Sequence, residues 1–301
     1  MCGIFGVVLR SDANFDRRRL PKLITKCFLL AESRGKEAAG LAVVLRDRIE
    51  IVKRPVRARS FLRDPQTQAT LRSAVDVTSL ADPLVVLGHT RMVTNGSPDN
   101  PDNNQPVIKG DLVCLHNGIV VNDLELWDRH PELDRDYEVD TEVLLAIVAQ
   151  ARRDGSTLAT AVARSLMETR GANSIALLGA RDEMLALATT NGSLFYVYAP
   201  DGSALMFASE RYILEQICTA SEVRQAFADT PPIQLIPRQG MIARFRDLRP
   251  QLFVVPPPSA SADPINGAAL PTDDQRQTER RIVDHRASNF APRTPLSLIH
   301  I

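Results

Sequence analysis

Short apolar segments joined by tight turns fill the chain between residues 174 and 208. Asn191-Gly192 and Asp201-Gly202 are dipeptides that favour the two-residue turns of β-hairpins. A third turn is expected at Arg181-Asp182-Glu183. The turns separate four expected strands, which are Ser174–Leu178, Met184–Thr189, Leu194–Tyr198 and Leu205–Ala208. Strands joined this closely run antiparallel, because a parallel connection needs a dozen or more residues.

The first part of the chain shows hairpins with helical stretches between them. Gly3–Leu9 is a continuous apolar run, typical of a strand buried on both faces. Apolar residues at helical spacing predict a helix from about Leu20 that ends at Gly35. Further strands and helices are expected at Gly40–Leu45, Ile49–Lys53, Leu84–Gly88, Leu112–His116, Thr141–Arg152 and Leu158–Met167. Hairpins outnumber βαβ units, which predicts an α+β fold of antiparallel sheets packed in layers against helices.

Charge and hydropathy exclude several classes of function. Lys plus Arg and Asp plus Glu both number 36, so no overall attraction to nucleic acid or to an anionic membrane is expected. No apolar run approaches the roughly 20 residues of a membrane span. Met1 is followed directly by Cys2, without the basic region or cleavage site of a signal peptide, so the cytoplasm is the expected compartment.

The cysteines and glycines predict neither a metal site nor a cofactor. Four cysteines lie far apart with no CxxC spacing, which argues against a disulfide framework and a structural zinc site. The sequence contains no phosphate-binding Gly-x-x-x-x-Gly-Lys-Ser/Thr loop and no Gly-x-Gly-x-x-Gly motif. We therefore expect no metal and no nucleotide cofactor.

Composition changes near residue 250. Pro256-Pro257-Pro258 opens a stretch rich in Ser, Ala, Asp, Pro and Gly, and a charged segment, Asp273–Arg286, follows it. A segment with so few periodic apolar positions cannot offset the entropy of ordering its chain. We predict one domain over residues 2–248 and a Pro-rich linker or tail, disordered or truncated, over residues 249–301.

Cys2 is a candidate nucleophile because of its position. Removal of Met1, which is usual before a small residue, would place a thiol and a free α-amine on Cys2. The amine has a pKa of about 7.7–8.0 and the thiol one of about 8.5, so the amine can accept the thiol proton near neutral pH. The alternative is an inert buried cysteine at the start of a strand, which is common in proteins.

Three other segments carry groups suited to an amide or amino-acid substrate. Asn117-Gly118 follows an expected strand and offers a side-chain amide beside an unobstructed backbone N–H, the donors that an oxyanion needs. By itself the pair is an ordinary turn. Arg91 can form a bidentate pair with a carboxylate, and the Thr94 hydroxyl lies three residues further on. Asp140 stands directly before an expected helix, where its ordinary role is that of an N-cap.

Six motifs occur in the order found in class II glutamine amidotransferases, and the chain resembles their glutaminase domain over about residues 2–246. The closest resemblance is to the glutaminase domain of glucosamine-6-phosphate synthases. The motifs are Cys2-Gly3-Ile4-Phe5-Gly6, Ser33-Arg34-Gly35 with Gly40, Gly88-His89-Thr90-Arg91, His116-Asn117-Gly118, Asp140-Thr141-Glu142-Val143 and Ala208-Ser209-Glu210. The family is an N-terminal-nucleophile hydrolase, which implies a four-layer αββα sandwich of antiparallel sheets.

The resemblance implies a role for each candidate residue. Cys2 would be the nucleophile and its α-amine the base. The Asn117 side chain and the Gly118 backbone would form the oxyanion hole. Arg91 and Thr94 would hold the α-carboxylate of glutamine, and Asp140 its α-amine. Met92 and Asn95 stand where the sugar-using branch usually has an aromatic residue and a histidine, and the loop from Ser97 to Pro106 is unusually long and polar.

The sequence thus predicts a domain that hydrolyses the side-chain amide of glutamine through a thioester on Cys2. Its ammonia would pass to a synthase, on the same chain or on another, in aminosugar or polysaccharide synthesis. One alternative is a stand-alone amidase on glutamine-like or γ-glutamyl compounds. The other is a non-catalytic module that senses glutamine, against which the retention of Cys2, Arg91 and Asn117-Gly118 argues.

Overall fold

The fold is seen in a computed structural model. It describes residues 2–45, 48–76, 83–92, 97, 100–220, 223, 226–227, 230–258 and 299–300. Within them, no helix has the length and apolar character that a membrane crossing requires.

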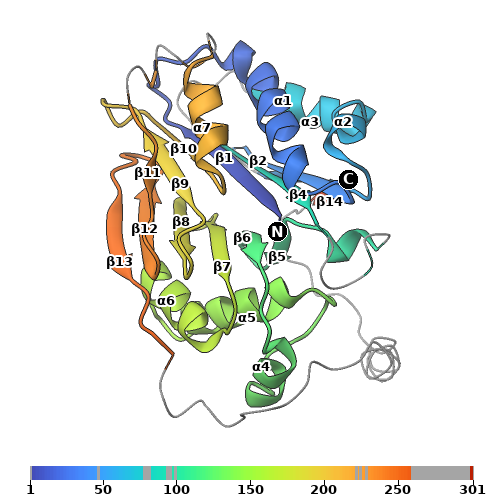
Figure 1. The fold of residues 1–301 in the computed structure, drawn as a ribbon, viewed down its shortest axis with the longest axis vertical. Coiled ribbons are helices and arrows are strands. Elements are labelled where there is room, and N and C mark those ends of the chain that lie inside the picture. Colours follow the sequence, from blue (N-terminus) through green and yellow to red (C-terminus); the bar gives the residue numbers. More distant parts are fainter. Residues whose placement is uncertain are drawn as a thin grey trace.

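Two β-sheets form the centre of the molecule (Figure 1). The first sheet has eight strands in the order β11 (Ile233–Gln234), β9 (Phe195–Tyr198), β10 (Ala204–Ala208), β1 (Gly3–Leu9), β4 (Leu84–Arg91), β2 (Ala38–Val44), β3 (Ile49–Arg54) and β14 (Ile299–His300). The second has six, in the order β13 (Gln251–Val254), β12 (Gln239–Arg244), β8 (Met184–Thr189), β7 (Asn173–Gly179), β6 (Leu112–Gly118) and β5 (Val107–Lys109). All pairings are antiparallel except that of β14 with β3.

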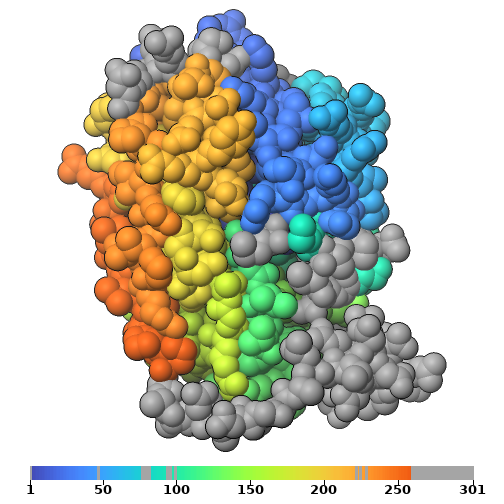
Figure 2. Space-filling view, in the orientation of Figure 1, coloured from blue at the N-terminus to red at the C-terminus, as the bar shows by residue number. Residues whose placement is uncertain are grey.

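Helices cover the outer face of each sheet. The first sheet carries α1 (Leu20–Ala31), α2 (Ala58–Phe61), α3 (Pro65–Asp76) and α7 (Arg211–Cys218). The second carries α4 (Asp123–Arg129), α5 (Asp140–Arg153) and α6 (Leu158–Glu168). Helices α1 and α7 lie side by side on the surface (Figure 2), where Lys26 Nζ donates to the Gln216 carbonyl.

Three apolar layers hold the four structural layers together. One lies between the first sheet and its helices, one between the second sheet and its helices, and one between the sheets. Along β1, Phe5 and Val7 face the helices, whereas Ile4 and Val8 face the other sheet. This period of two explains why Gly3–Leu9 reads as a continuous apolar run. The predicted α+β αββα sandwich of antiparallel sheets is confirmed.

The ordered fold continues past residue 248, the end that the sequence predicts for the domain. β13 pairs with β12 through residues 251–254, and Val255 is buried. Leu252 and Val254 are exposed, because β13 is an edge strand with only one covered face. Most of the remaining tail lies outside the described residues.

Candidate active site

The polar residues of the site lie at one end of the layer between the two sheets. Along β6, Val113 and Leu115 face this layer, so the side chain of Asn117 points the same way by the period of two. Along β4, Val85 and Leu87 also face this layer. Alternation along the strand therefore points the side chains of His89 and Arg91 into it as well. Cys2 directly precedes β1, and the same alternation places its side chain on the face of Ile4. In Figure 1 the start of β1, marked N, lies against β6.

Cys2 is buried and its sulfur contacts the backbone that follows Arg91. Met92 N–H donates to Cys2 Sγ at 3.4 Å, and Sγ lies 3.5 Å from the Met92 carbonyl oxygen. Burial raises the pKa of the Cys2 thiol, while the Met92 N–H and the positive charge of Arg91 act to lower it. The thiol therefore needs a base to ionise near neutral pH, although groups that stabilise the thiolate are already in place.

Asn117 is the one side chain among the described residues whose amide oxygen and nitrogen are both buried without a hydrogen-bond partner. Its exposed fraction is 0%. An unpaired buried polar group costs about 1–3 kcal/mol, so proteins seldom keep one without a functional reason. At the next position a Cβ would lie 2.0 Å from the Ala172 carbonyl oxygen, which restricts position 118 to glycine.

Arg91 ends β4 and is buried beside Cys2 and Asp140. Its Nη1 donates to Asn104 Oδ1 at 2.7 Å. The acceptor is an uncharged amide, which orients the guanidinium without cancelling its charge. Thr94, the second residue predicted to hold a carboxylate, lies outside the described residues.

Asp140 is buried at the start of α5, and its position corrects the N-cap expected from the sequence. The helix begins at Asp140 itself, and the N-cap residue is Val139. The Asp140 carboxylate reaches the segment that follows β6, where Oδ2 accepts a hydrogen bond of 2.8 Å from Val120 N–H. A negative charge in the first turn of a helix is favourable, and this one acts on Cys2 and Arg91 electrostatically.

Two buried histidines flank the site and are held uncharged. Burial lowers the pKa of His89 to about 3, with a further lowering from the charge of Arg91. Burial also lowers the pKa of His116. The His116 ring bridges Thr141 Oγ1 at 3.0 Å and Asn173 Oδ1 at 2.9 Å. The ring thus fixes β6 to α5 and β7 just before Asn117, and does not face the thiol.

Motifs that lie far apart in the sequence contact one another around Cys2. Ser209 N–H donates to the Ile4 carbonyl at 2.9 Å, and Ile4 N–H donates to Ser209 Oγ at 3.2 Å. Arg34 and Glu210 form an ion pair at 3.1 Å. Thr90 Oγ1 donates to the Ala31 carbonyl at 2.8 Å. These contacts anchor β1 and β4 at the ends that carry Cys2 and Arg91.

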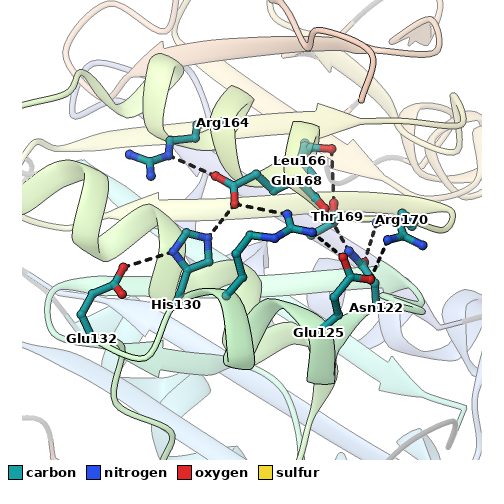
Figure 3. A network of polar contacts seen from close by, with 10 residues as sticks. Asn122, Glu125, His130, Glu132, Arg164, Leu166, Glu168, Thr169 and Arg170 are labelled. Carbon is teal, nitrogen blue, oxygen red and sulfur yellow. Dashed lines mark hydrogen bonds and ion pairs between the residues drawn. The ribbon is translucent and has the colours of Figure 1, made fainter. Parts of the chain in front are cut away.

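A polar network fixes the segment that follows Gly118 (Figure 3). Asn122 Oδ1 accepts from Arg170 N–H at 2.7 Å, and Asn122 Nδ2 donates to the Glu168 carbonyl at 3.0 Å. His130, at the end of α4, contacts the Glu168 carboxylate at 2.6 Å. The start and the end of α4 are therefore both tied to the end of α6. Among the described residues, no cluster of histidine, cysteine and carboxylate side chains could hold a metal ion.

Comparison with known proteins identifies the family. The glutamine amidotransferase domain GATase_7 matches residues 89–216, which include Arg91, Asn117 and Asp140. The chain contains a glutamine amidotransferase domain, homologous to the glutaminase domain of class II glutamine amidotransferases. Glutamine–fructose-6-phosphate aminotransferase [isomerizing] of Geobacillus kaustophilus is 29% identical over 227 residues, covering 71% of this chain and 34% of the relative. The protein of the same name from Pyrobaculum aerophilum is 32% identical over 185 residues, covering 60% and 28%.

The amidotransferase chain spans about a third of the length of these curated relatives. Its fold matches that of the glutamine phosphoribosylpyrophosphate amidotransferase of B. subtilis, with a TM-score of 0.62 at 20% identity. The match covers 85% of this chain and 49% of the B. subtilis chain. This match confirms the fold of the N-terminal-nucleophile amidotransferases.

Sequence reasoning missed the residues that hold the site in this amidotransferase domain. Asn104, Gln105, Thr141 and Asn173 all bond to Arg91 or to His116, directly before Asn117. Asn104 and Gln105 are amides in a polar loop, where such residues are common, and Asn173 is the first residue of the apolar strand β7. A run of three amides directly before Pro106 was the one signal that could have marked the loop as a structured element.

Proposed function

We propose that this chain hydrolyses the side-chain amide of glutamine to glutamate and ammonia, with Cys2 as the nucleophile. The observation that carries the proposal is the orphaned amide of Asn117, which faces the same end of the layer between the sheets as Cys2. A donor held ready without a partner is what an oxyanion hole requires, because the oxyanion exists only during the reaction.

The reaction needs a base, and none of the described side chains that contact Cys2 supplies one. Once Met1 is removed, the α-amine of Cys2 takes the thiol proton as Sγ attacks the amide carbon. The oxyanion is held by Asn117 Nδ2 and the Gly118 N–H. The C–N bond then breaks, the amine returns the proton to the leaving nitrogen, and ammonia departs. Water, activated by the same amine, hydrolyses the thioester and releases glutamate.

Arg91 and Asp140 supply complementary charges for the α-carboxylate and the α-ammonium of glutamine, and the sequence assigns Thr94 to the α-carboxylate as well. Both charged side chains are buried next to Cys2, where Coulomb interactions are stronger than in water. Since the α-amino-acid end of glutamine does not react, these groups contribute to binding more than to the chemical step.

The test is a kinetic comparison of Arg91→Ala and Asp140→Asn with wild type. Each should raise KM for glutamine by about 10–100-fold, because a charge-assisted hydrogen bond is worth about 1.5–3 kcal/mol. Asp140→Asn keeps an oxygen that accepts from Val120 N–H, so its fold should be retained. Arg152→Ala is the matched control, because Arg152 pairs with Asp182 at the far end of α5. An unchanged KM for Arg91→Ala would show that Arg91 does not bind the α-carboxylate of glutamine.

The same assay separates the two alternatives. Fast release of glutamate by the isolated chain, independent of any acceptor, would favour a stand-alone amidase. Binding of glutamine without turnover would favour a sensor. The names of the curated relatives suggest that ammonia passes to a synthase in aminosugar synthesis, on a further part of the protein or on a partner chain in the cytoplasm.

A further inference from the structure

Three consecutive amide side chains in the loop after Arg91 each bond to a different part of the site. Asn103, Asn104 and Gln105, which we call the amide triplet, are all buried although their loop is polar. The triplet begins at the last residue of a short 3-10 helix, Pro101–Asn103, whose N-cap is Asn100. Burying three amides in succession is favourable only if each finds partners.

Asn103 anchors the loop to the segment before α5. Its Oδ1 accepts from Glu138 N–H at 3.1 Å, and its Nδ2 donates to Glu138 Oε2 at 2.7 Å. Neither bond involves Arg91 or β6. Asn103 therefore fixes the position of the loop itself.

The Asn104 side chain points toward the first sheet, away from the partner of Asn103. Its Oδ1 accepts from Arg91 Nη1 at 2.7 Å, while its Nδ2 lies 3.4 Å from the Asn100 carbonyl oxygen. The amide is thereby held in the orientation that presents its oxygen to Arg91. This bond constrains the guanidinium that would bind the substrate carboxylate.

The Gln105 side chain bonds to the backbone of β6 as a neighbouring strand would. Its Oε1 accepts from His116 N–H at 2.6 Å, and its Nε2 donates to the His116 carbonyl at 3.0 Å. A second contact of Nε2, at 3.4 Å, is with Thr141 Oγ1. One side chain thus satisfies both backbone groups of the residue that precedes Asn117, as a neighbouring strand would.

The Gln105 backbone also presses against the first sheet. A Cβ at Gly40 of β2 would lie 1.9 Å from the Gln105 carbonyl oxygen, so only glycine permits this approach. The amide triplet therefore contacts β2, β6 and the segment before α5. Asn104 contacts Arg91 on the first sheet, and Gln105 contacts His116, the residue before Asn117, on the second.

We propose that Asn104 and Gln105 are positioning residues with separate tasks, Asn104 for Arg91 and Gln105 for Asn117. The proposal rests on the proposed glutaminase activity. Asn104 sets the geometry of glutamine binding, whereas Gln105 sets the geometry of the oxyanion hole by fixing His116. Neither side chain takes part in bond making.

The experiment is a split between KM and kcat in variants of similar size. Asn104→Leu should raise KM for glutamine about tenfold and leave kcat within about threefold of wild type, since a lost bond to a charged group weakens binding by this order. Gln105→Met should lower kcat about tenfold and leave KM within about threefold. Calorimetry of glutamine on a Cys2→Ala background should show weaker binding for Asn104→Leu only.

Asn103→Ala is the matched control, because it removes a buried amide of the same loop that touches neither half of the site. It should lower Tm and leave KM and kcat within about twofold of wild type. The same loss of both KM and kcat in all three variants would show that the loop acts as one structural unit and would overturn the separate tasks. Asn104→Asp, which keeps an acceptor for Arg91, covers the case in which Asn104→Leu does not fold. This variant should also raise KM, because its charge competes with the substrate carboxylate for Arg91.

Failure of the proposed function gives a different result. If the wild-type chain neither hydrolyses nor binds glutamine, the proposed glutaminase activity is refuted, and the tasks assigned to Asn104 and Gln105 are refuted with it. If the wild type is active but Asn104→Leu and Gln105→Met do not differ in their effects on KM and kcat, only the separate tasks are refuted.

Discussion

A Cys2→Ala chain should release glutamate at least about 10⁴-fold more slowly than wild type, because loss of a nucleophile removes the covalent route entirely. Glutamine should still bind with a Kd within about threefold of wild type, since Arg91 and Asp140 remain. Glutamate release and isothermal titration with glutamine measure the two effects.

Cys218→Ala provides the control for this substitution. Cys218 ends α7 on the outer side of the first sheet and is only partly buried. Its loss should leave glutamate release within about twofold of wild type. Substantial turnover by Cys2→Ala, or an equal loss in Cys218→Ala, would contradict the role of Cys2 as the nucleophile.

Asn117→Leu should lower kcat by about 10²–10³-fold, the usual cost of removing one donor from an oxyanion hole. The same substitution should leave Tm unchanged or raise it. Wild type buries both polar atoms of the amide without a partner, and leucine of similar size has no such penalty. A gain of stability with a loss of activity is the expected signature of a residue kept for function.

Asn173→Leu is the comparison for stability. Asn173 is equally buried, but its Oδ1 bonds to the His116 ring and its Nδ2 lies 3.3 Å from the Gly171 carbonyl oxygen. Its replacement should lower Tm, because these partners are left unsatisfied. A drop in Tm for Asn117→Leu as large as that for Asn173→Leu would show that Asn117 has a structural task instead.

Strands with strong apolar runs could be predicted from the sequence because their pattern is local. The structure places β1 at Gly3–Leu9 and β8 at Met184–Thr189, the ranges expected. Hydrophobic periodicity does not predict helix α3, because its buried side includes the polar residues Thr67 and Thr70. Composition assigns β13 to the tail because Pro256-Pro257-Pro258 and a long polar stretch directly follow this short strand.

The site shows the same division between local and long-range information. The parity of β6 places Asn117 between the sheets, which alternation along the strand from Leu115 could indicate. The hydrogen bond that Arg91 donates to Asn104 spans 13 positions, and that between Gln105 and His116 spans 11 across a loop. No periodicity predicts which amides of a polar loop turn inward. The contact of Asp140 with Val120 likewise depends on how α5 packs against β6.

The most direct test of the account is the mass of the chain during turnover. A sample quenched in acid within milliseconds of mixing with glutamine should lack Met1 and carry one γ-glutamyl group, which peptide mapping should place on Cys2. Blocking the α-amine with one extra N-terminal residue should prevent both the adduct and glutamate release. Release of glutamate by chains that retain Met1, or a γ-glutamyl group on any other residue, would contradict an N-terminal cysteine nucleophile.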